Sequence, residues 1–341
     1  MMKRRTIALI ALLAAIPAVA MACGGDDDDD GGNGNDGGSL EQVTLMLNWT
    51  PNTHHNGIYA AIEEGYYRDA GLDVRIVEPA AGGVEQVVAT GGAEFGISVQ
   101  ESMIPARAEG VPVISIGTII QHNDSSLMML ESEDVSEPKD FAGKTYGGYG
   151  GPLETALIHQ LVECDGGDPD AVKFVEVGNV DYLVGMEQDR FDFAWVFESW
   201  DVIRAREIAN KEVKSILFKD HLDCIPDWYT PLFITGEDMI AKRPDTVRKF
   251  MEATARGYDF AIENPKEAGE ALLKGAPELD TKLVELSSEY MADVFVDEGR
   301  QWGLQDREIW EEFEKFLREA GLTSKEVDVD KAFTNDFLPD R

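Results

Sequence analysis

The chain has 341 residues, of which 43% are apolar and 28% charged, so it is long enough to bury one large core or two lobes. Its formal net charge of −35 excludes nucleic acid and an anionic membrane surface as partners, because both require positive charge on the protein. No internal repeat of solenoid period and no zinc-type spacing of Cys and His occur, so the sequence indicates neither a repeat protein nor a zinc module.

The first residues have the layout of a secretory signal. The basic start MMKRR is followed by the apolar run TIALIALLAAIPAVAMA and then by Cys23. The small residues Ala20 and Ala22 before Cys23 resemble the lipobox of bacterial lipoproteins, in which the cysteine becomes the lipid-modified first residue; plain signal cleavage is the alternative. We therefore predict a signal peptide at residues 1–22 and a lipid anchor on Cys23, which would hold the protein on the extracytoplasmic side of the cell membrane, in the periplasm or at the cell surface.

Residues 23–38 predict a flexible acidic tether. After Cys23 they consist of GGDDDDDGGNGNDGG. Glycine removes backbone restraint and the Asp run repels itself, so this segment cannot bury a core. As a flexible coil it would span roughly 20 Å between the anchor and a folded body.

From residue 39 the chain alternates short apolar runs with amphipathic segments, which is the order of an α/β fold. LDVRIV (72–77) alternates as a strand does, whereas Ile58, Ile62 and Tyr66 recur at a spacing of four and mark one face of a helix. The first set of expected strands comprises VTLML, LDVRIV, FGISV and VISIGTII.

A second set of alternating elements begins near the Gly-rich turn TYGGYGG (145–151), and after YTPLFIT (229–235) the pattern changes to helices. The helix within PDTVRKFMEATARGYDFAIENP starts at a proline and closes at Pro265. Strand–helix–strand order implies mostly parallel sheets flanked by helices, and such sheets bind ligands beyond the carboxyl ends of their strands. The turns at those ends contain NWTPNTHHNG, PAAGGVE, VQES, GGYGGPLE and FESW.

Aromatic side chains are unusually frequent in these turns. Trp49 offers a flat face in a polar turn, and stacking on an aromatic ligand contributes roughly 0.5–1.5 kcal/mol beyond burial. Tyr149, Trp200, Trp228 and Tyr229 also fall in turns or at helix starts, which favours an aromatic-lined site; cover for a lobe junction is the alternative for the last two. His54 and His55 are adjacent and would point in different directions on a helix, so a cap or a hydrogen bond to an organic ligand is favoured over a metal.

Carboxylates accompany the aromatic residues. Glu101, Glu154 and Glu198 each follow a strand-to-helix turn, where a Glu by itself is commonly a helix cap. Together with the aromatic residues, and with few basic residues nearby, they favour a neutral, amino-bearing heteroaromatic ligand over an anion. GGYGGPLE lacks the Lys and the spacing of a phosphate-binding loop, so a close backbone approach to a ligand or a plain tight turn is expected there.

Two cysteines remain in the folded part, Cys164 and Cys224. Outside the cytoplasm they can form one disulfide, or they can stay as two free buried thiols. The sequence leaves these alternatives open.

Several segments together carry a family resemblance. LNWTPNTHHNGIYAAIEEGYYRDAGLDV, GGVEQVVATGGAEFGIS, ARAEGVPVISIGTI and RPDTVRKFMEATARGYDFAIENPKEA resemble the pyrimidine-precursor branch of the substrate-binding proteins of ABC importers. That family also includes binders of riboflavin, aliphatic sulfonates and nitrate. The NWTPN turn is the most specific part of the match and is similar to the pyrimidine and riboflavin branches.

The resemblance implies a two-lobe periplasmic binding protein fold of type II. Lobe 1 would comprise residues 39–128 and 234–341, and lobe 2 residues 129–233, with a hinge of two crossovers near LMMLES and YTPLFIT. The ligand would lie between the lobes, and lobe closure would let an ABC permease and its ATPase subunits recognise the loaded form. We expect a monomer without a cofactor or a metal.

On this basis we expect the chain to bind a thiamine pyrimidine precursor and not to act as an enzyme. Trp49 and Tyr149 would stack on the ring, and Asn48, His55, Gln100 and Glu198 would form hydrogen bonds with it. The other expected ligand-binding residues are Glu154, Trp200 and Trp228.

Two alternatives remain open at this stage. Riboflavin or an aliphatic sulfonate or nitrate can replace the pyrimidine within the same family. The second alternative is a pyrimidine synthase that consumes pyridoxal phosphate and one of its own histidines. The resemblance places its cofactor lysine at Ser98 and its consumed histidine at Ser102, and neither is present here, although His55 matches a histidine of that branch.

Overall fold

The structure is a computed structural model that describes residues 39–79 and 83–340. The signal peptide, Cys23 and the acidic tether of residues 23–38 lie outside the described residues. Within the described part, no helix combines the length and the apolar character that crossing a membrane requires.

The first sheet has five strands in the order β2-β1-β3-β10-β4. Strands β1 and β2 pair in parallel, as do β1 and β3, whereas β10 runs antiparallel to both β3 and β4. Four strands therefore share one direction, and the late strand β10 is inserted against them. The strands are β1 (Glu41–Met46), β2 (Leu72–Val77), β3 (Phe95–Ser98), β4 (Val113–Thr118) and β10 (Leu232–Gly236).

The second sheet repeats this plan in the order β7-β6-β8-β5-β9. Strand β6 pairs in parallel with β7 and β8, and β5 runs antiparallel to β8 and β9. Each sheet is thus mostly parallel with one reversed strand, which confirms the expected α/β class. The strands are β5 (Ser125–Leu130), β6 (Thr145–Gly148), β7 (Lys173–Glu176), β8 (Phe193–Phe197) and β9 (Val213–Leu217).

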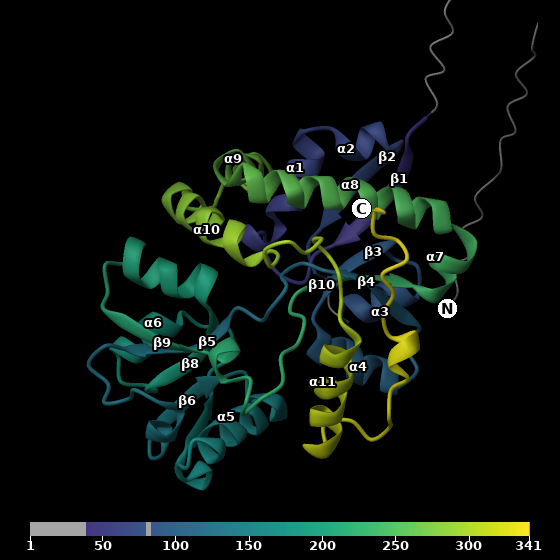
Figure 1. Ribbon diagram of the computed structural model, residues 1–341. Helices are drawn as coiled ribbons and strands as arrows, with labels where there is room; N and C mark the ends of the chain where they lie inside the picture. The colour runs from purple at the N-terminus through teal and green to yellow at the C-terminus, as the bar shows by residue number, and fades with distance from the viewer. Residues whose placement is uncertain (1–38, 80–82, 341) are drawn as a thin grey trace, which may run out of the picture. The chain divides into compact units, whose positions relative to one another are not determined.

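Helices flank both sheets, and Figure 1 shows α8 and α9 beside α1 over the first sheet and α6 beside the second. Helices α8 and α9 both have proline at their first position, where its missing N–H costs no hydrogen bond. The segment ESWDVIRAREI forms two wider π-helical turns, Glu198–Val202 and Arg204–Ile208. The helices are α1 (Asn56–Glu63), α2 (Tyr66–Asp69), α3 (Val84–Ala89), α4 (Gln100–Ala108), α5 (Pro152–Cys164), α6 (Tyr182–Glu187), α7 (Glu237–Lys242), α8 (Pro244–Glu263), α9 (Pro265–Gly275), α10 (Thr281–Val294) and α11 (Arg307–Glu319).

The chain passes between the sheets twice. The first passage connects β4 to β5 through residues 119–124, and the second connects β9 to β10 through residues 218–231. The expected lobe limits at 128/129 and 233/234 fall inside β5 and β10, so the LMML part of LMMLES belongs to a strand of the second sheet, and the crossover lies before it. The family resemblance implied a boundary here, but the backbone of this run pairs on both sides, with β8 and β9.

Stacked aromatic rings fill the core under the first sheet. The ring centre of Phe250 in α8 lies 3.8 Å from that of Phe95 in β3 and 5.4 Å from that of Tyr67. Further along α8, the ring of Tyr258 stacks on that of Trp302, with the ring centres 4.1 Å apart. Each of these rings is buried, so α8 is held against the sheet along most of its length.

The two cysteines form a disulfide, which settles the alternative that the sequence left open. Cys164 ends α5, and Cys224 lies in the second passage between the sheets, with the two Cα atoms 5.6 Å apart. The bond connects this passage covalently to a helix of the second sheet.

The crossing of α1 and α8 depends on two glycines in contact. A Cβ at Gly257 would overlap the carbonyl oxygen of Gly57, and one at Gly57 would overlap the ring of Tyr258. In an exposed helix Gly→Ala stabilises by about 1 kcal/mol. At this crossing we expect Gly257→Val to lower the free energy of unfolding by about 3 kcal/mol, because overpacking forces two backbones apart.

Chemical denaturation of Gly257→Val and of the unchanged protein checks this expectation. Glu252→Val, at an exposed position of the same helix, is the matched control and should change the free energy of unfolding only slightly. Equal stability of Gly257→Val and the unchanged protein would contradict the close crossing.

Candidate functional site: an aromatic and acidic cavity

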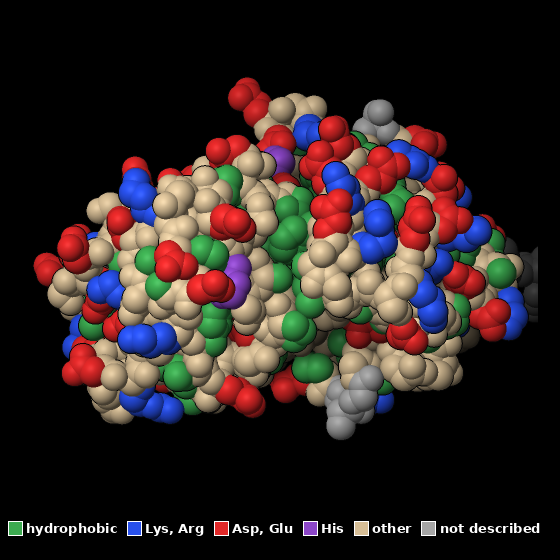
Figure 2. Space-filling model, turned by 90° about the horizontal axis from the view of Figure 1, so that it is seen from below, with side chains coloured by type: hydrophobic (Ala, Val, Ile, Leu, Met, Phe, Trp, Pro, Cys, Tyr) green, Lys and Arg blue, Asp and Glu red, His purple; other side chains and the backbone are tan. Residues whose placement is uncertain are grey.

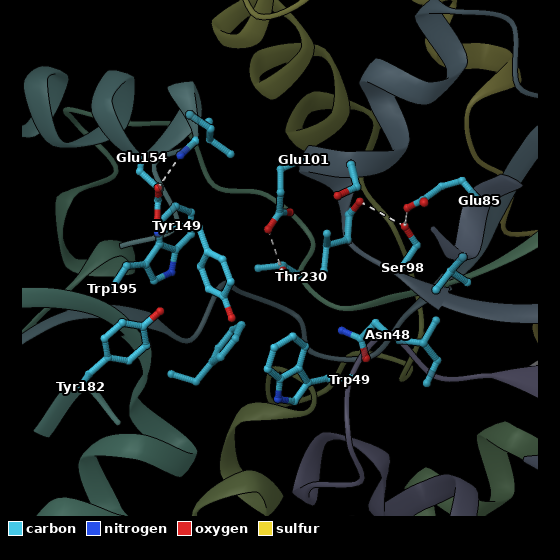
Figure 3. Close-up of a pocket in the computed structure, with 17 residues that line it drawn as sticks. Asn48, Trp49, Glu85, Ser98, Glu101, Tyr149, Glu154, Tyr182, Trp195 and Thr230 are labelled. Carbon is cyan, nitrogen blue, oxygen red and sulfur yellow. Dashed lines mark hydrogen bonds between the residues drawn. The ribbon is translucent and has the colours of Figure 1, made fainter. Parts of the chain in front are cut away.

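A cavity of about 650 Å3 lies where turns from the two sheets meet (Figure 3). Its walls come from the ends of β3 and β8, from the turns after β1 and β6, from the starts of α3, α4, α5 and α6, and from Thr230 in the second passage. Apart from Thr230, these segments lie at or after the carboxyl ends of parallel strands, where ligands of open α/β sheets bind. The lining residues are Asn48, Trp49, Val84, Glu85, Ile97, Ser98, Val99, Glu101, Ser102, Tyr149, Gly151, Leu153, Glu154, Tyr182, Trp195, Phe197 and Thr230.

A second cavity of about 320 Å3 adjoins the first and shares its aromatic walls. Trp49 and Tyr149 line both cavities, and they are among the few large apolar side chains with substantial exposure, 46% and 51%. Figure 3 shows Tyr149 between Glu101 and the pair Trp195 and Tyr182, with Trp49 below it, next to Asn48. The exposed rings offer flat apolar surface to a ligand.

The NWTPNTHHNG turn is held by its second histidine. His55 is fully buried; its Nδ1 accepts a hydrogen bond from the backbone N–H of Asn52 at 3.2 Å, and its Nε2 lies 3.3 Å from Oδ1 of Asn48. These contacts require a neutral ring with the proton on Nε2, and burial together with the neighbouring His54 lowers the pKa of His55 to about 3. His55 therefore positions Asn48 at the cavity wall and does not line the cavity itself.

His54 points the other way, toward the second sheet. Its ring packs edge-to-face on Phe197 at 5.1 Å, and its Nε2 lies 3.3 Å from Oγ of Ser199. Its carbonyl oxygen accepts a hydrogen bond from the Tyr258 hydroxyl at 2.8 Å. The histidine pair thus ties the turn to α8 and to the π-helical turns. No group of His, Cys, Asp and Glu side chains in the described parts of the chain is arranged to hold a metal ion.

Because His55 stays neutral in the folded protein, it makes stability depend on pH. Between pH 6.5 and about 3 the unfolded chain binds a proton at this ring and the folded chain does not, so stability is lost as the pH falls. We expect His55→Gln to remove a slope of about 1.4 kcal/mol per pH unit in this window. Urea unfolding of the unchanged protein and of His55→Gln at pH 6.5, 5.5 and 4.5 measures this slope. If the free energy of unfolding changed equally with pH in both proteins, the buried neutral ring would be contradicted.

Three carboxylates line the larger cavity. Glu154 is fully used by its own turn: it accepts hydrogen bonds from the Tyr146 hydroxyl (2.7 Å) and from the backbone N–H groups of Tyr149 (3.0 Å) and Gly151 (2.7 Å). The Gly-rich turn therefore wraps a carboxylate of the chain itself, and the N–H groups of Tyr149 and Gly151 are not free to bind a ligand anion. Of the two alternatives for this turn, these hydrogen bonds favour the plain tight turn over a close backbone approach to a ligand, and they explain how the backbone of Tyr149 is fixed.

Glu101 and Glu85 have fewer partners. Glu101 accepts hydrogen bonds from Trp228 Nε1 at 3.0 Å and from the Thr230 hydroxyl at 3.4 Å, and Ser98 donates its hydroxyl proton to Glu85. Burial is the main cause that raises the pKa of Glu101 to about 7, and the negative charge of Glu85 adds to it. Glu101 is therefore a carboxyl that changes its charge near neutral pH at the wall of the cavity.

Four residues expected to touch a ligand do not line either cavity. His55 lies behind the wall, as described above, and Gln100 is buried with its Oε1 accepting from the backbone N–H of Tyr229 at 2.8 Å. Glu198 is buried beside Arg206, with Nη1–Oε1 at 3.2 Å, and Trp228 stacks on Phe313 in the core. Asn48, Trp49, Tyr149 and Glu154 line the larger cavity, and Trp200 lines the smaller one.

Several lining residues lay outside the expected set. In the sequence Glu101 is only one of three Glu residues at helix starts. Trp195 and Phe197 belong to the strand FAWVF, whose five residues are all apolar, so the sequence does not indicate which face points to the cavity. Tyr182 begins α6, where it resembles an ordinary helix residue. The preceding turn would have been the only indication that Glu101 faces a ligand.

Basic side chains are absent from the lining of the larger cavity among the described residues, and the smaller cavity has His54 and Arg204. An anion bound in the larger cavity would face three carboxylates without a cationic partner in these walls. The geometry favours a flat ligand with hydrogen-bond donors.

A sequence profile described as NMT1/THI5 like matches residues 52–268, which include most of both sheets and all the turns after β3, β6 and β8. The chain belongs to the NMT1/THI5-like family. Its first cavity-lining turn, with Asn48 and Trp49, lies just before the matched range.

Three relatives of this NMT1/THI5-like protein cover most of its length. The formylaminopyrimidine-binding protein of Halalkalibacterium halodurans is 28% identical over 88% of this chain and 92% of its own. The riboflavin-binding protein RibY of Chloroflexus aurantiacus is 29% identical over 88% and 87%. The 4-amino-5-hydroxymethyl-2-methylpyrimidine phosphate synthase of Legionella pneumophila is 28% identical over 88% and 93%. The family thus contains named binding proteins and a named synthase.

Solved structures agree on the fold. The periplasmic aliphatic sulphonate binding protein SsuA of Escherichia coli has a TM-score of 0.66 at 12% identity, with 86% of this chain and 92% of that chain covered. The periplasmic nitrate-binding protein NrtA of Synechocystis PCC 6803 has a TM-score of 0.65 at 13% identity, with 87% of each chain covered. At this identity the similarity shows the two-lobe periplasmic binding protein fold of this NMT1/THI5-like protein.

Proposed function

We propose that this NMT1/THI5-like protein is an extracytoplasmic solute-binding lipoprotein of an ABC importer and that it captures an aminopyrimidine precursor of thiamine. The cavity carries this proposal: Trp49 and Tyr149 offer exposed ring faces, carboxylates provide acceptors, and no described basic side chain lines the larger chamber. The named formylaminopyrimidine-binding relative supports the same ligand class.

The ring would stack on Trp49 and Tyr149, and Asn48 and Glu101 would bind its polar edge. The ionised carboxylate of Glu101 accepts a hydrogen bond from an exocyclic amino group, and the amide of Asn48 can donate to a ring nitrogen. A binding constant in the micromolar range corresponds to about −8 kcal/mol, which one or two stacks and a few hydrogen bonds can supply.

The two passages between the sheets, residues 119–124 and 218–231, would serve as the hinge. Closure of the lobes would bury the ring and form the surface that an ABC permease recognises. The anchor on Cys23 and the acidic tether would hold the monomer near that permease.

Riboflavin is the second candidate. The smaller cavity adjoins the larger one through the shared rings of Trp49 and Tyr149, so the two together can hold a ligand longer than one pyrimidine. A riboflavin-binding protein is among the named relatives. The absence of basic side chains from the described lining of the larger cavity opposes a sulfonate or nitrate ligand.

A synthase activity has little support in the cavity. Ser98 and Ser102, the positions that the resemblance assigns to the cofactor lysine and the consumed histidine, line the larger cavity, but they carry hydroxyl groups. A hydroxyl cannot form the Schiff base that pyridoxal phosphate requires.

Thermal unfolding with a panel of compounds tests the proposal. The panel contains 4-amino-5-hydroxymethyl-2-methylpyrimidine, riboflavin, taurine and nitrate. A ligand at about 100 times its Kd should raise the free energy of unfolding by about 2.7 kcal/mol. A shift with the pyrimidine alone is expected. A shift with taurine or nitrate and none with the pyrimidine or riboflavin would overturn the proposal, and consumption of pyridoxal phosphate would favour the synthase.

A further inference from the structure

The larger cavity combines excess negative charge with exposed aromatic faces. We propose that it selects a cationic heteroaromatic ring, protonated or alkylated at a ring nitrogen, over the neutral ring of the same shape. This inference rests on the proposed function, since it specifies the charge of the ligand at the same site.

Two carboxylates of the larger cavity, Glu85 and Glu101, have no cationic partner among the described residues. Among the described residues, no Lys, Arg or His forms an ion pair with Glu85 or Glu101, although many surface carboxylates of this chain have one. Glu85 is bonded to Ser98, and Glu101 to Trp228 and Thr230, all neutral donors. Their charges therefore remain available to a ligand in the cavity.

The aromatic side chains of the cavity also favour a cationic ligand. The face of an aromatic ring carries partial negative charge and attracts a cation within about 6 Å of its centre, most strongly for Trp and Tyr. Trp49 and Tyr149 are half-exposed, and Figure 3 shows Tyr182 and Trp195 beside Tyr149. A flat cation can stack on these faces while its N–H edge meets a carboxylate, whereas a neutral ring gains only the stacking.

Glu101 supports this inference through its own titration. Burial and the charge of Glu85 raise its pKa to about 7, so its ionised form is unfavourable in the empty cavity. A bound cation would relieve this repulsion and lower the pKa of Glu101. Binding of a cation near pH 7 should therefore release protons, which calorimetry in two buffers with different ionisation enthalpies detects.

The experiment compares two methylated aminopyrimidines of nearly equal size and shape on the full-length protein at pH 8. The cation is 4-amino-1,2-dimethylpyrimidinium, and the neutral control is 4-amino-2,6-dimethylpyrimidine, which carries the same methyl group on carbon. We expect the cation to bind at least about tenfold more tightly, because cation–π attraction and a carboxylate act together. Equal or weaker binding of the cation would overturn the inference, whereas binding of the neutral pyrimidine would leave the proposed function intact.

Three variants test which carboxylates cause the preference for the cation over the neutral pyrimidine. Glu101→Gln and Glu85→Gln should each reduce the ratio of the two affinities several-fold, since each removes one negative charge and keeps the shape. Glu252→Gln, at an exposed position on α8 outside the cavity, should leave the ratio unchanged. A ratio that is equal in all four proteins would show that these carboxylates do not select the ligand.

A second pair of probes separates the inference from the proposed function. If neither pyrimidine binds, the proposed function fails, and 1-methylnicotinamide is then compared with its neutral carbon analogue 3-methylbenzamide. Tighter binding of the methylated cation would support a cation site of another ligand class. Absence of a preference, or no binding of either compound, would overturn the inference.

Discussion

Replacing Trp49 with alanine should weaken ligand binding by about 30-fold and leave the free energy of unfolding nearly unchanged. The ring lines both cavities, and 46% of its surface is exposed, so it contributes little to the folded core. A ligand that stacks on it loses the stacking term and the burial of one ring face, about 2 kcal/mol together, and 1.4 kcal/mol corresponds to a factor of ten. Titration calorimetry with the compound that gives the largest thermal shift measures the loss.

Two further variants make this result specific. Trp49→Phe keeps a ring face and should recover most of the affinity. Leu222→Ala removes an apolar side chain of the same fractional exposure, 46%, that lies outside both cavities, and it should not change the affinity. Unchanged binding by Trp49→Ala would remove the aromatic face from the site and contradict the proposed function.

Replacing Glu101 with glutamine should stabilise the folded protein at high pH and at the same time weaken binding of a ligand amino group. Folding raises the pKa of this carboxyl from 4.5 to about 7. Between these pH values the folded protein holds a proton that the unfolded chain has released, so the free energy of unfolding falls as the pH rises from 4.5 through 7. At pH 8 the ionised group costs about 3 kcal/mol, an order-of-magnitude value from 1.4 kcal/mol per pKa unit. Glutamine has no such cost and keeps an oxygen for Trp228 Nε1.

The measurement is urea unfolding of both proteins at pH 4.5 and pH 8. The two should have similar stability at pH 4.5, and the glutamine variant should be the more stable one at pH 8. His55 changes the stability of both proteins in the same way, so its effect cancels in the difference. Glu252→Gln is the matched control and should show no such pH-dependent difference. A difference that does not change with pH would contradict the raised pKa.

A carboxyl that destabilises the fold at neutral pH is typical of a functional position. Glu101 lies at the cavity wall, and two neutral donors hold it in place. If a ligand amino group or a cation pairs with Glu101, it stabilises the buried ionised carboxylate, and this stabilisation contributes to the free energy of binding. Gain of stability and loss of affinity in the same variant would therefore support a binding role more strongly than either result alone.

The order of the elements could be predicted from the sequence because local patterns determine it. LDVRIV alternates and forms β2 over the expected residues, and α8 starts at Pro244 and ends before Pro265, as expected. The sequence did not predict that Pro265 itself begins a further helix, α9. The position of LMMLES could not be predicted in the same way. Its apolar side chains suit a hinge or a strand equally, and only pairing with β8 and β9 decides between them.

The sequence by itself determined that the NWTPN turn, the GGYGG turn and the start of α4 follow strands, and therefore that the site would form there. Only the tertiary structure decided which side chains of these segments face the cavity. Gln100 and Glu101 are adjacent polar residues at one helix start, and they point about 100° apart. Tyr229 and Thr230, 129 residues further along the chain, bind Gln100 into the core and leave Glu101 at the cavity wall. A local pattern cannot encode that choice, because it depends on which distant segment the fold brings alongside.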